Sequence, residues 1–254
     1  MLAWRAYRER SVVEPLGDLA LVAMYVINGP TKIDNIPGQW SPAEHNRAGL
    51  ILQAGKEDGL YSNGECIDGT IHLEPDQTII KLSDSVLAVA TEQPGSKYLL
   101  AIYNQSADAV KNFKSIACYD EDRSWILEGK YVQSDKLTFN FSHTADQANH
   151  ERIHQSLGEV HVEIAGRMYQ LRPFNSGNLE IIVFRDATSG QETYSMGRML
   201  IVEKMDNGTV KLDFNRAFLP PCAFSPFFNC PMPPASNRID AFIRAGEKQV
   251  VFNK

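Results

Sequence analysis

The chain has 254 residues, of which 43% are hydrophobic and 22% are charged, proportions typical of a globular protein with one large β domain or two small ones. Its formal net charge of −6 argues against a nucleic-acid partner, because a phosphate backbone is bound by clustered lysine and arginine. The most apolar run, Leu19–Ile27, is too short to cross a bilayer, and the residues after Met1 lack the apolar core of a signal peptide. We therefore expect a soluble, cytoplasmic protein with no membrane partner.

The first part of the chain, residues 1–105, is predicted to contain one short helix and a series of short strands. The helix covers Leu2–Glu9, and the apolar run Leu19–Ile27 is typical of a buried strand. Asn63-Gly64 and Asp68-Gly69 are dipeptides typical of tight hairpin turns. Alternating apolar and polar residues predict further strands at Gly49–Gln53, Thr70–Leu73, Thr78–Leu82, Val86–Thr91 and Tyr98–Tyr103.

The middle of the chain carries weaker patterns. One or two helical turns are predicted within Ser106–Phe113, followed by strands at Trp125–Val132 and Lys136–Phe141. The polar stretch Ser142–Leu157 then indicates a linker or an excursion from the sheet.

The C-terminal part, within residues 106–254, shows the clearest strand pattern. Apolar segments alternate with dipeptides suited to tight turns, such as Ala165-Gly166 and Asn207-Gly208, which predicts a five-strand antiparallel meander. Its strands are Val160–Ile164, Met168–Leu171, Leu179–Phe184, Gly197–Val202 and Val210–Phe214. Alternation over Ile239–Ala245 predicts one last strand. We therefore expect an all-β protein, a barrel or a sandwich, built as two subdomains, 1–105 and 106–254, or as one continuous domain.

A segment rich in proline and phenylalanine, Phe218–Pro234, lies between the meander and the last predicted strand. Its prolines prevent a helix and most ladder hydrogen bonds. Its four phenylalanines favour burial. We therefore expect an ordered, irregular segment that packs on the meander.

The residues around this segment resemble those of a known family. Phe184–Leu200, FRDATSGQETYSMGRML, and Asp213–Lys248, which contains DFNRAFLPPC, CPMPP, NR and AGEK, are similar to the signature of the bacterial and archaeal family called domain of unknown function 1684. Ala109–Val132 is similar to the middle block of that family, and WRAYRE near the N-terminus to its opening element. The resemblance implies no activity, because the family is named for lacking an assigned function.

Polar residues of this signature are the candidate ligand-binding residues. Arg198 and Arg216 would offer planar guanidinium groups to a carboxylate or a phosphate. The whole set is Asp186, Tyr194, Arg198, Asp213, Asn215 and Arg216. One interpretation places a small anionic or amphipathic ligand in a cleft beside the signature. The other is that these residues pair with one another and hold the proline-rich segment in place, since lone buried charges are costly. We expect Arg216 to be such a structural pin and Arg198 to face the ligand.

A second motif, HERIH at His150–His154, matches the H-E-x-x-H pattern of zinc proteases. That pattern works on a helix, where two imidazoles four residues apart face one metal and the glutamate activates water. The residues before it are too polar for a buried helix, so we expect a solvated linker without a metal site. The alternative function is a metal-dependent hydrolase that uses His150, Glu151 and His154.

The four cysteines do not have the spacing of a zinc site, and we interpret them as buried thiols, although Cys222 and Cys230 could close a small loop if oxidised. The sequence contains no G-x-S-x-G nucleophile motif, no dinucleotide-binding G-x-G-x-x-G and no P-loop, so no cofactor is expected. Whether the protein is an enzyme stays open at this stage, and a non-catalytic binding protein is the preferred hypothesis.

Overall fold

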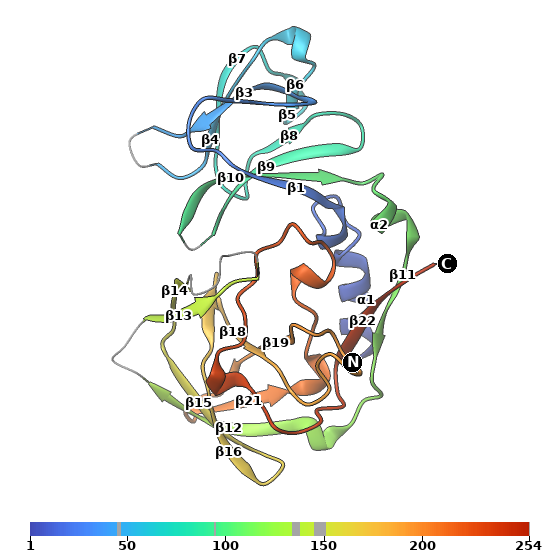
Figure 1. The fold of residues 1–254 in the computed structure, drawn as a ribbon, viewed down its shortest axis with the longest axis vertical. Helices are drawn as coiled ribbons and strands as arrows, with labels where there is room; N and C mark the ends of the chain where they lie inside the picture. The colour runs from blue at the N-terminus through green and yellow to red at the C-terminus, as the bar shows by residue number, and fades with distance from the viewer. Residues whose placement is uncertain (45–46, 94, 134–137, 145–150, 254) are drawn as a thin grey trace. The chain divides into compact units, whose positions relative to one another are not determined.

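The computed structural model describes residues 1–44, 47–93, 95–133, 138–144 and 151–253. Two compact units are distinguished: an N-terminal unit, Arg10–Phe113, and a C-terminal unit formed by Met1–Glu9 and Lys114–Lys254. The boundary predicted at residues 105 and 106 stays a prediction. Short antiparallel strands dominate both units (Figure 1), so the predicted all-β class is confirmed. No helix in the described part of the chain is long and apolar enough to cross a membrane.

The N-terminal unit contains two antiparallel sheets, with strand orders β1-β10-β9-β8-β5-β6 and β2-β3-β4-β7. Its strands are β1 (Leu21–Val26), β2 (Thr31–Ile33), β3 (Ile36–Pro42), β4 (Leu50–Ala54), β5 (Tyr61–Ser62), β6 (Glu65–Cys66), β7 (Gly69–Leu73), β8 (Ile79–Lys81), β9 (Val86–Gln93) and β10 (Ser96–Asn104). Its helices are η1 (Asp18–Ala20), η2 (Lys56–Asp58) and α2 (Asp108–Asn112). Trp40 and Leu52 of one sheet pack with Ile80 and Leu100 of the other in one buried cluster, so the unit is sandwich-like.

The C-terminal unit contains a five-stranded sheet, β16-β15-β12-β21-β20, a three-stranded sheet, β17-β18-β19, and the pairs β13-β14 and β11-β22. Its strands are β11 (Phe113–Cys118), β12 (Ile126–Gln133), β13 (Thr138–Ser142), β14 (Glu151–Gln155), β15 (Gly158–Ile164), β16 (Arg167–Leu171), β17 (Phe174–Ser176), β18 (Leu179–Phe184), β19 (Arg198–Ile201), β20 (Glu203–Lys204), β21 (Thr209–Asp213) and β22 (Glu247–Phe252). Its helices are η3 (Arg123–Trp125), η4 (Phe214–Arg216), η5 (Pro221–Ala223), η6 (Ala235–Asn237) and the first residues of α1 (Leu2–Ser11). The last strand, β22, runs beside β11 (Figure 1).

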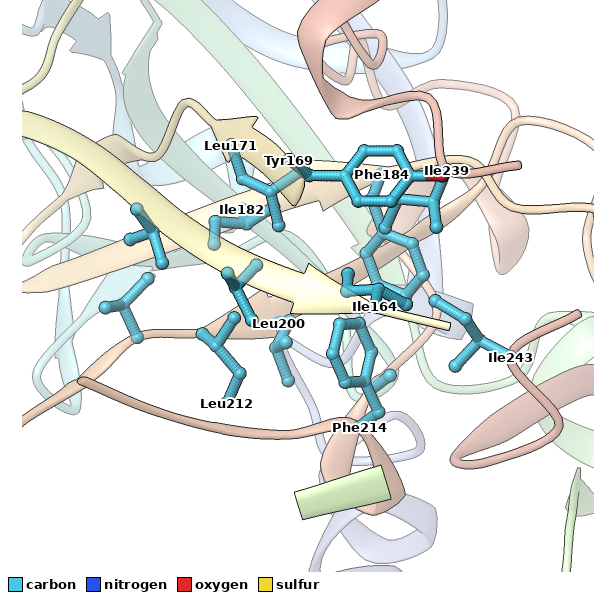
Figure 2. Close-up of a cluster of buried hydrophobic side chains, with 14 of the residues drawn as sticks. Ile164, Tyr169, Leu171, Ile182, Phe184, Leu200, Leu212, Phe214, Ile239 and Ile243 are labelled. Atoms are coloured by element: carbon cyan, nitrogen blue, oxygen red, sulfur yellow. The ribbon is translucent and has the colours of Figure 1, made fainter. Parts of the chain in front are cut away.

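The core of the C-terminal unit is organised around β18, whose apolar run is buried on both faces. Because side chains alternate along a strand, Ile182 and Phe184 face one cluster while Ile181 and Val183 face a second. Figure 2 shows the first cluster, in which side chains of β18 lie among those of β16, β19 and β21. The rings of Phe184 and Phe214 meet edge to face, with their centroids 5.4 Å apart. Burial on both faces explains why β18 lacks polar alternation.

The predicted five-strand meander is wrong in its strand order, although all five segments contain strands. β15 and β16 are neighbours as predicted, but β18 and β19 belong to another sheet, and β21 pairs with β12 and β20. The chain changes sheet at Val202, whose N–H bonds to the carbonyl of Glu180 at 2.9 Å, whereas the next residue, Glu203, pairs with Lys211. The turn at Asn207-Gly208 therefore joins β20 to β21 and does not join β19 to β21.

Two further segments differ from their predicted state. Within the predicted polar linker, Glu151–Gln155 forms strand β14 and pairs with β13, because His154 belongs to a buried aromatic layer with Phe141. The predicted strand Ile239–Ala245 is not a strand in the described structure, although Ile239 and Ile243 are buried. The backbone here makes only isolated bonds with the segment after β18, such as Ile239 N–H to the carbonyl of Arg185 at 2.7 Å, so the apolar alternation reflects packing and not a full strand ladder.

Candidate functional site

The proline-rich segment is packed against the C-terminal unit by backbone pairing and by ring burial. Phe218 exchanges two backbone hydrogen bonds with Met199 of β19, at 2.8 and 2.9 Å. Phe224 is buried, whereas Phe227 is exposed. Short helices η5 and η6 supply local backbone bonds where proline prevents ladder bonding. The segment is therefore ordered and can contribute residues to a binding site.

Arg198 is fully enclosed, with 0% of its surface exposed. Its guanidinium donates to the carbonyls of Ile243 (2.9 Å), Ala245 and Glu247 (3.3 Å), and Nη2 lies 3.3 Å from Oδ2 of Asp186. The predicted ligand-facing role of Arg198 is wrong. The side chain extends from β19 beneath an irregular stretch of backbone, and the carbonyls of that stretch use the guanidinium in place of ladder donors.

Asp186 completes this buried network. Its carboxylate accepts hydrogen bonds from the hydroxyls of Thr188 (2.9 Å) and Ser189 (3.1 Å) and from the backbone N–H of Ile243 (2.8 Å). Burial lowers the pKa of Arg198 from its ordinary value, and the nearby Asp186 carboxylate opposes that shift. Asp186 is thus a turn residue and the counter-ion of Arg198, and it does not face solvent.

A second buried carboxylate, Glu247, anchors the N-terminal helix. It accepts from Nε of Arg8 at 2.9 Å and from the backbone N–H of Leu219 at 2.7 Å. The guanidinium of Arg8 also lies over the rings of Phe218 and Phe224, 5.1 and 5.8 Å from their centroids. Arg8 and Glu247, which are 239 positions apart, therefore hold the proline-rich segment against α1. The sequence did not predict this pairing. The available signal was the N-terminal WRAYRE element of the family resemblance.

The remaining members of the predicted set do not converge with Arg198. Asp213 caps η4 by accepting from the N–H of Asn215 at 3.1 Å. The amide of Asn215 bonds both the N–H and the carbonyl of Asp122, each at 2.9 Å. Arg216 pairs with Glu203 at 2.9 Å. These contacts fit the predicted role of Arg216 as a structural pin.

Tyr194 is the member of the set that lines a pocket. We call this pocket, of about 360 Å³, the signature pocket. It is lined by Gly190, Thr193, Tyr194, Ser195, Leu219, Ala223, Gln249, Val250 and Phe252. Tyr194 donates its hydroxyl to the carbonyl of Cys222 at 3.0 Å, and burial raises the pKa of its phenol. The phenol therefore stays protonated, and it is the titratable group among the described lining residues.

Two charged side chains next to the signature pocket, Glu192 and Arg244, are paired with each other. Glu192 receives three hydrogen bonds from Arg244, at 2.7, 3.0 and 3.1 Å, and one from the hydroxyl of Tyr119 at 2.8 Å. The bonds from Arg244, followed by the bond from Tyr119, lower the pKa of Glu192 to about 2, while burial and then Glu192 raise the pKa of Tyr119 to about 12. The flank of the pocket thus carries an ion pair between Glu192 and Arg244. Neither Glu192 nor Tyr119 gains or loses a proton near neutral pH.

The HERIH motif does not form the zinc-protease geometry. Glu151–Gln155 is a strand, so Glu151 and His154 point to opposite faces, one exposed and the other buried. His150 lies outside the described residues. His154 instead meets His143, with 2.8 Å between their Nε2 atoms and the rings stacked. Burial, followed by the positive charge available on His143 and Arg152, lowers the pKa of His154 to about 4. The hydrolase alternative loses its structural basis, because its glutamate cannot serve a metal held by His154.

The cysteines are not joined by disulfides in this structure, and all four lie among the described residues. Cys230 accepts a weak hydrogen bond at Sγ from the N–H of Cys222, 3.3 Å away. Burial raises the pKa of Cys118 to about 11, so its thiol is unreactive near neutral pH. Within the described ranges, no three histidine, cysteine, aspartate or glutamate residues are grouped so as to hold a metal ion.

A family model described as "Protein of unknown function (DUF1684)" matches residues 111–248, more than half of the chain. The chain belongs to this family. The resemblance seen in the sequence is thereby confirmed. No curated protein matches the chain.

The region matched by the DUF1684 model contains all six predicted ligand-binding residues and most of the signature pocket. Residues 1–110, which include α1 and all but the last three residues of the N-terminal unit, lie outside it. Among solved structures, the chain is similar to a solution NMR structure of an uncharacterized protein of Haloarcula marismortui, with 27% identity and a TM-score of 0.44 over 54% of this chain and 77% of that one.

Proposed function

We propose that the C-terminal unit binds a small amphipathic ligand, without chemical transformation, in the signature pocket. The observation that carries the proposal is the composition of the pocket wall. Leu219, Val250, Phe252 and the ring of Tyr194 supply apolar surface, and neighbouring hydroxyl and amide groups supply hydrogen bonds. Small-molecule sites in proteins commonly combine an apolar wall with a few placed polar groups in a volume of this order.

The distribution of charge favours an amphipathic ligand over an anionic one. The described lining of the signature pocket contains no lysine or arginine. Arg198 is enclosed, Arg216 is paired with Glu203 and Arg244 is paired with Glu192. Among the described lining residues an anion would therefore find neutral donors and no cation, which weakens its binding relative to an uncharged amphiphile.

The absence of a reactive pair in the described lining supports binding without catalysis. A hydroxyl nucleophile is commonly activated by a base within hydrogen-bond reach. The lining hydroxyls belong to Thr193, Ser195 and Tyr194, and the raised pKa of Tyr194 makes its phenol a donor that is already used by a backbone carbonyl.

Fluorescence titration with N-phenylnaphthylamine, a neutral amphiphile, tests the proposal. We expect saturable binding to the wild-type protein and about tenfold weaker binding in Phe252→Ala, since about 1.4 kcal/mol of lost contact corresponds to a factor of ten. Ala223→Trp should block binding by filling the pocket. Phe242→Ala is the matched control, because Phe242 is exposed to a similar extent (46% against 43% for Phe252) and does not line the pocket.

The same titration with anilinonaphthalene sulfonate compares an anionic amphiphile of similar size. Stronger binding of the sulfonate than of the neutral probe would favour the anionic ligand. Equal binding of the neutral probe to wild type, Phe252→Ala and Ala223→Trp would refute the signature pocket as the site.

A further inference from the structure

A second pocket of the C-terminal unit, of about 380 Å³, lies where β17, β18 and β20 meet. Its lining includes the polar residues Glu180, Asn175 and Lys204 and the apolar residues Leu157 and Val202. None of its lining residues belongs to the signature pocket. The two pockets are therefore different sites, and a ligand of one does not contact the lining residues of the other.

Glu180 is a carboxylate withdrawn from water, with only 10% of its side chain exposed. Its Oε1 accepts a hydrogen bond from the hydroxyl of Tyr131 at 2.6 Å. Burial, followed by this contact with Glu180, raises the pKa of Tyr131, so the phenol stays a donor. The other oxygen, Oε2, forms an ion pair with Lys204, whose Nζ lies 3.0 Å away.

A second acceptor stands beside this carboxylate. Asn175 and Glu180 are directly opposite each other on β17 and β18, a register that brings their side chains close together. The side-chain oxygen of Asn175 is buried and has no hydrogen-bond donor in the part of the chain that the structure describes. A buried acceptor without a protein donor is unusual in a folded protein, and this oxygen can accept a hydrogen bond from a ligand or from water.

An aromatic face completes the surroundings of a cation. The ammonium of Lys204 lies 4.0 Å from the centroid of the Tyr131 ring while it is paired with Glu180. Carboxylate, amide oxygen and aromatic ring together are the groups that recognise ammonium ions in binding proteins. Lys204 is itself 46% exposed along its side chain, on a strand of two residues, so its long side chain can move into solvent.

We propose that this pocket is a binding site for a small primary alkylammonium ligand, and that Lys204 occupies its cation position in the free protein. The ligand ammonium replaces that of Lys204 between Glu180 and the ring of Tyr131. One of its three N–H groups is directed at the amide oxygen of Asn175. Its alkyl chain lies against Leu157 and the neighbouring apolar wall. Because a tethered competitor acts at a high effective concentration, Lys204 weakens binding until it is displaced.

Calorimetric titration with n-butylammonium tests this assignment. We expect Lys204→Met to bind the probe at least roughly tenfold more tightly than wild type, because removal of the tethered ammonium ends the competition. The matched control is Lys211→Met. Lys211 forms an ion pair with Glu203 at 3.1 Å and is 38% exposed, so its loss also breaks a surface pair but leaves the pocket unchanged. Glu180→Gln introduced into the Lys204→Met protein should abolish binding.

The chemistry of the ligand is tested with n-butanol and butanoate, which have the same chain length and different charge. Tight binding of n-butylammonium alone supports the cation site. Equal binding of the butanol, or affinity in Lys204→Met no higher than in wild type and Lys211→Met, would overturn the proposal. If Lys204→Met is poorly folded, Lys204→Gln provides the same test, since its amide can still donate to Glu180 while it carries no charge.

Discussion

The stacked pair of His143 and His154 makes the stability of the C-terminal unit depend on pH. His143 Nδ1 lies 2.8 Å from the carbonyl oxygen of Asn229, which can only accept, so Nδ1 carries the proton. While both imidazoles are neutral, Nε2 of His143 then accepts from the Nε2–H of His154. His154 is 5% exposed, and its ring packs between those of Phe141 and Phe174. A charge on His154 would therefore be buried among apolar rings.

The magnitude follows from the lowered pKa. Because the pKa of His154 falls from 6.5 to about 4 on folding, the unfolded state binds the proton more tightly. The stability contributed by neutral His154 is complete above pH 6.5 and is lost as the pH falls from 6.5 towards 4. Linkage gives a loss of about 3 kcal/mol at low pH, of which about 2 kcal/mol has developed at pH 5.

Urea denaturation of wild type and His154→Gln between pH 7.5 and pH 5 measures this effect. Other groups titrate in the same range, so the relevant quantity is the difference in pH dependence between the two proteins. We expect wild type to lose about 2 kcal/mol more than His154→Gln over this interval. His161→Gln, which removes a partly exposed histidine, is the control and should behave as wild type. Parallel pH profiles for wild type and His154→Gln, or an imidazole titration of His154 above pH 6 by NMR, would refute the reasoning.

Three further predictions concern stability measured by urea denaturation at neutral pH. Arg198→Lys keeps the charge but loses the planar fork that bonds several carbonyls, and we expect a loss of about 3 kcal/mol; unchanged stability would show that the network is dispensable. Phe224→Ala should cost about 3 kcal/mol, whereas Phe227→Ala, at an exposed ring, should cost less than about 0.5 kcal/mol; equal losses would contradict the packing described. Gly197→Ala should cost more than Gly208→Ala, because both have positive φ but a Cβ at Gly197 would lie 2.2 Å from a carbonyl oxygen, while none lies within 4 Å at Gly208.

Local patterns in the sequence predicted local structure well. The dipeptides Asn63-Gly64 and Ala165-Gly166 predict hairpin turns, and all four residues have positive φ, with values between 51° and 84°. Asparagine and glycine tolerate this conformation, whereas Ala165 adopts it at a steric cost. The hairpin predicted at Asp68-Gly69 is wrong, because the strands on either side of it, β6 and β7, belong to different sheets. A turn dipeptide indicates a change of direction, and the identity of the next partner strand depends on contacts that the dipeptide does not encode.

Long-range partners account for most of the errors. Alternation over Ile239–Ala245 correctly indicates burial of Ile239 and Ile243. The backbone there bonds to the side chains of Asp186 and Arg198 and to isolated backbone groups after β18, and it forms no strand. The polar composition around His154 suggested a linker, yet one buried imidazole with Phe141 was enough to place a strand in the core. Composition averages over a segment, whereas strand pairing depends on which face each residue occupies.

The buried polar residues of the signature hold irregular backbone in place, and this is why they do not mark the binding surface. Backbone groups outside a ladder still need hydrogen-bond partners when they are buried. Arg198, Asp186, Asn215 and Asn237 each bond backbone groups of segments distant in the sequence. Replacing one of them removes the partner of a buried group, so loss of folding would be mistaken for loss of a ligand contact. Tyr194 differs, because its side chain lines the signature pocket while its hydroxyl donates a hydrogen bond to the backbone carbonyl of Cys222. Binding has to be tested on residues such as those of the pocket rim, whose replacement leaves the buried framework intact.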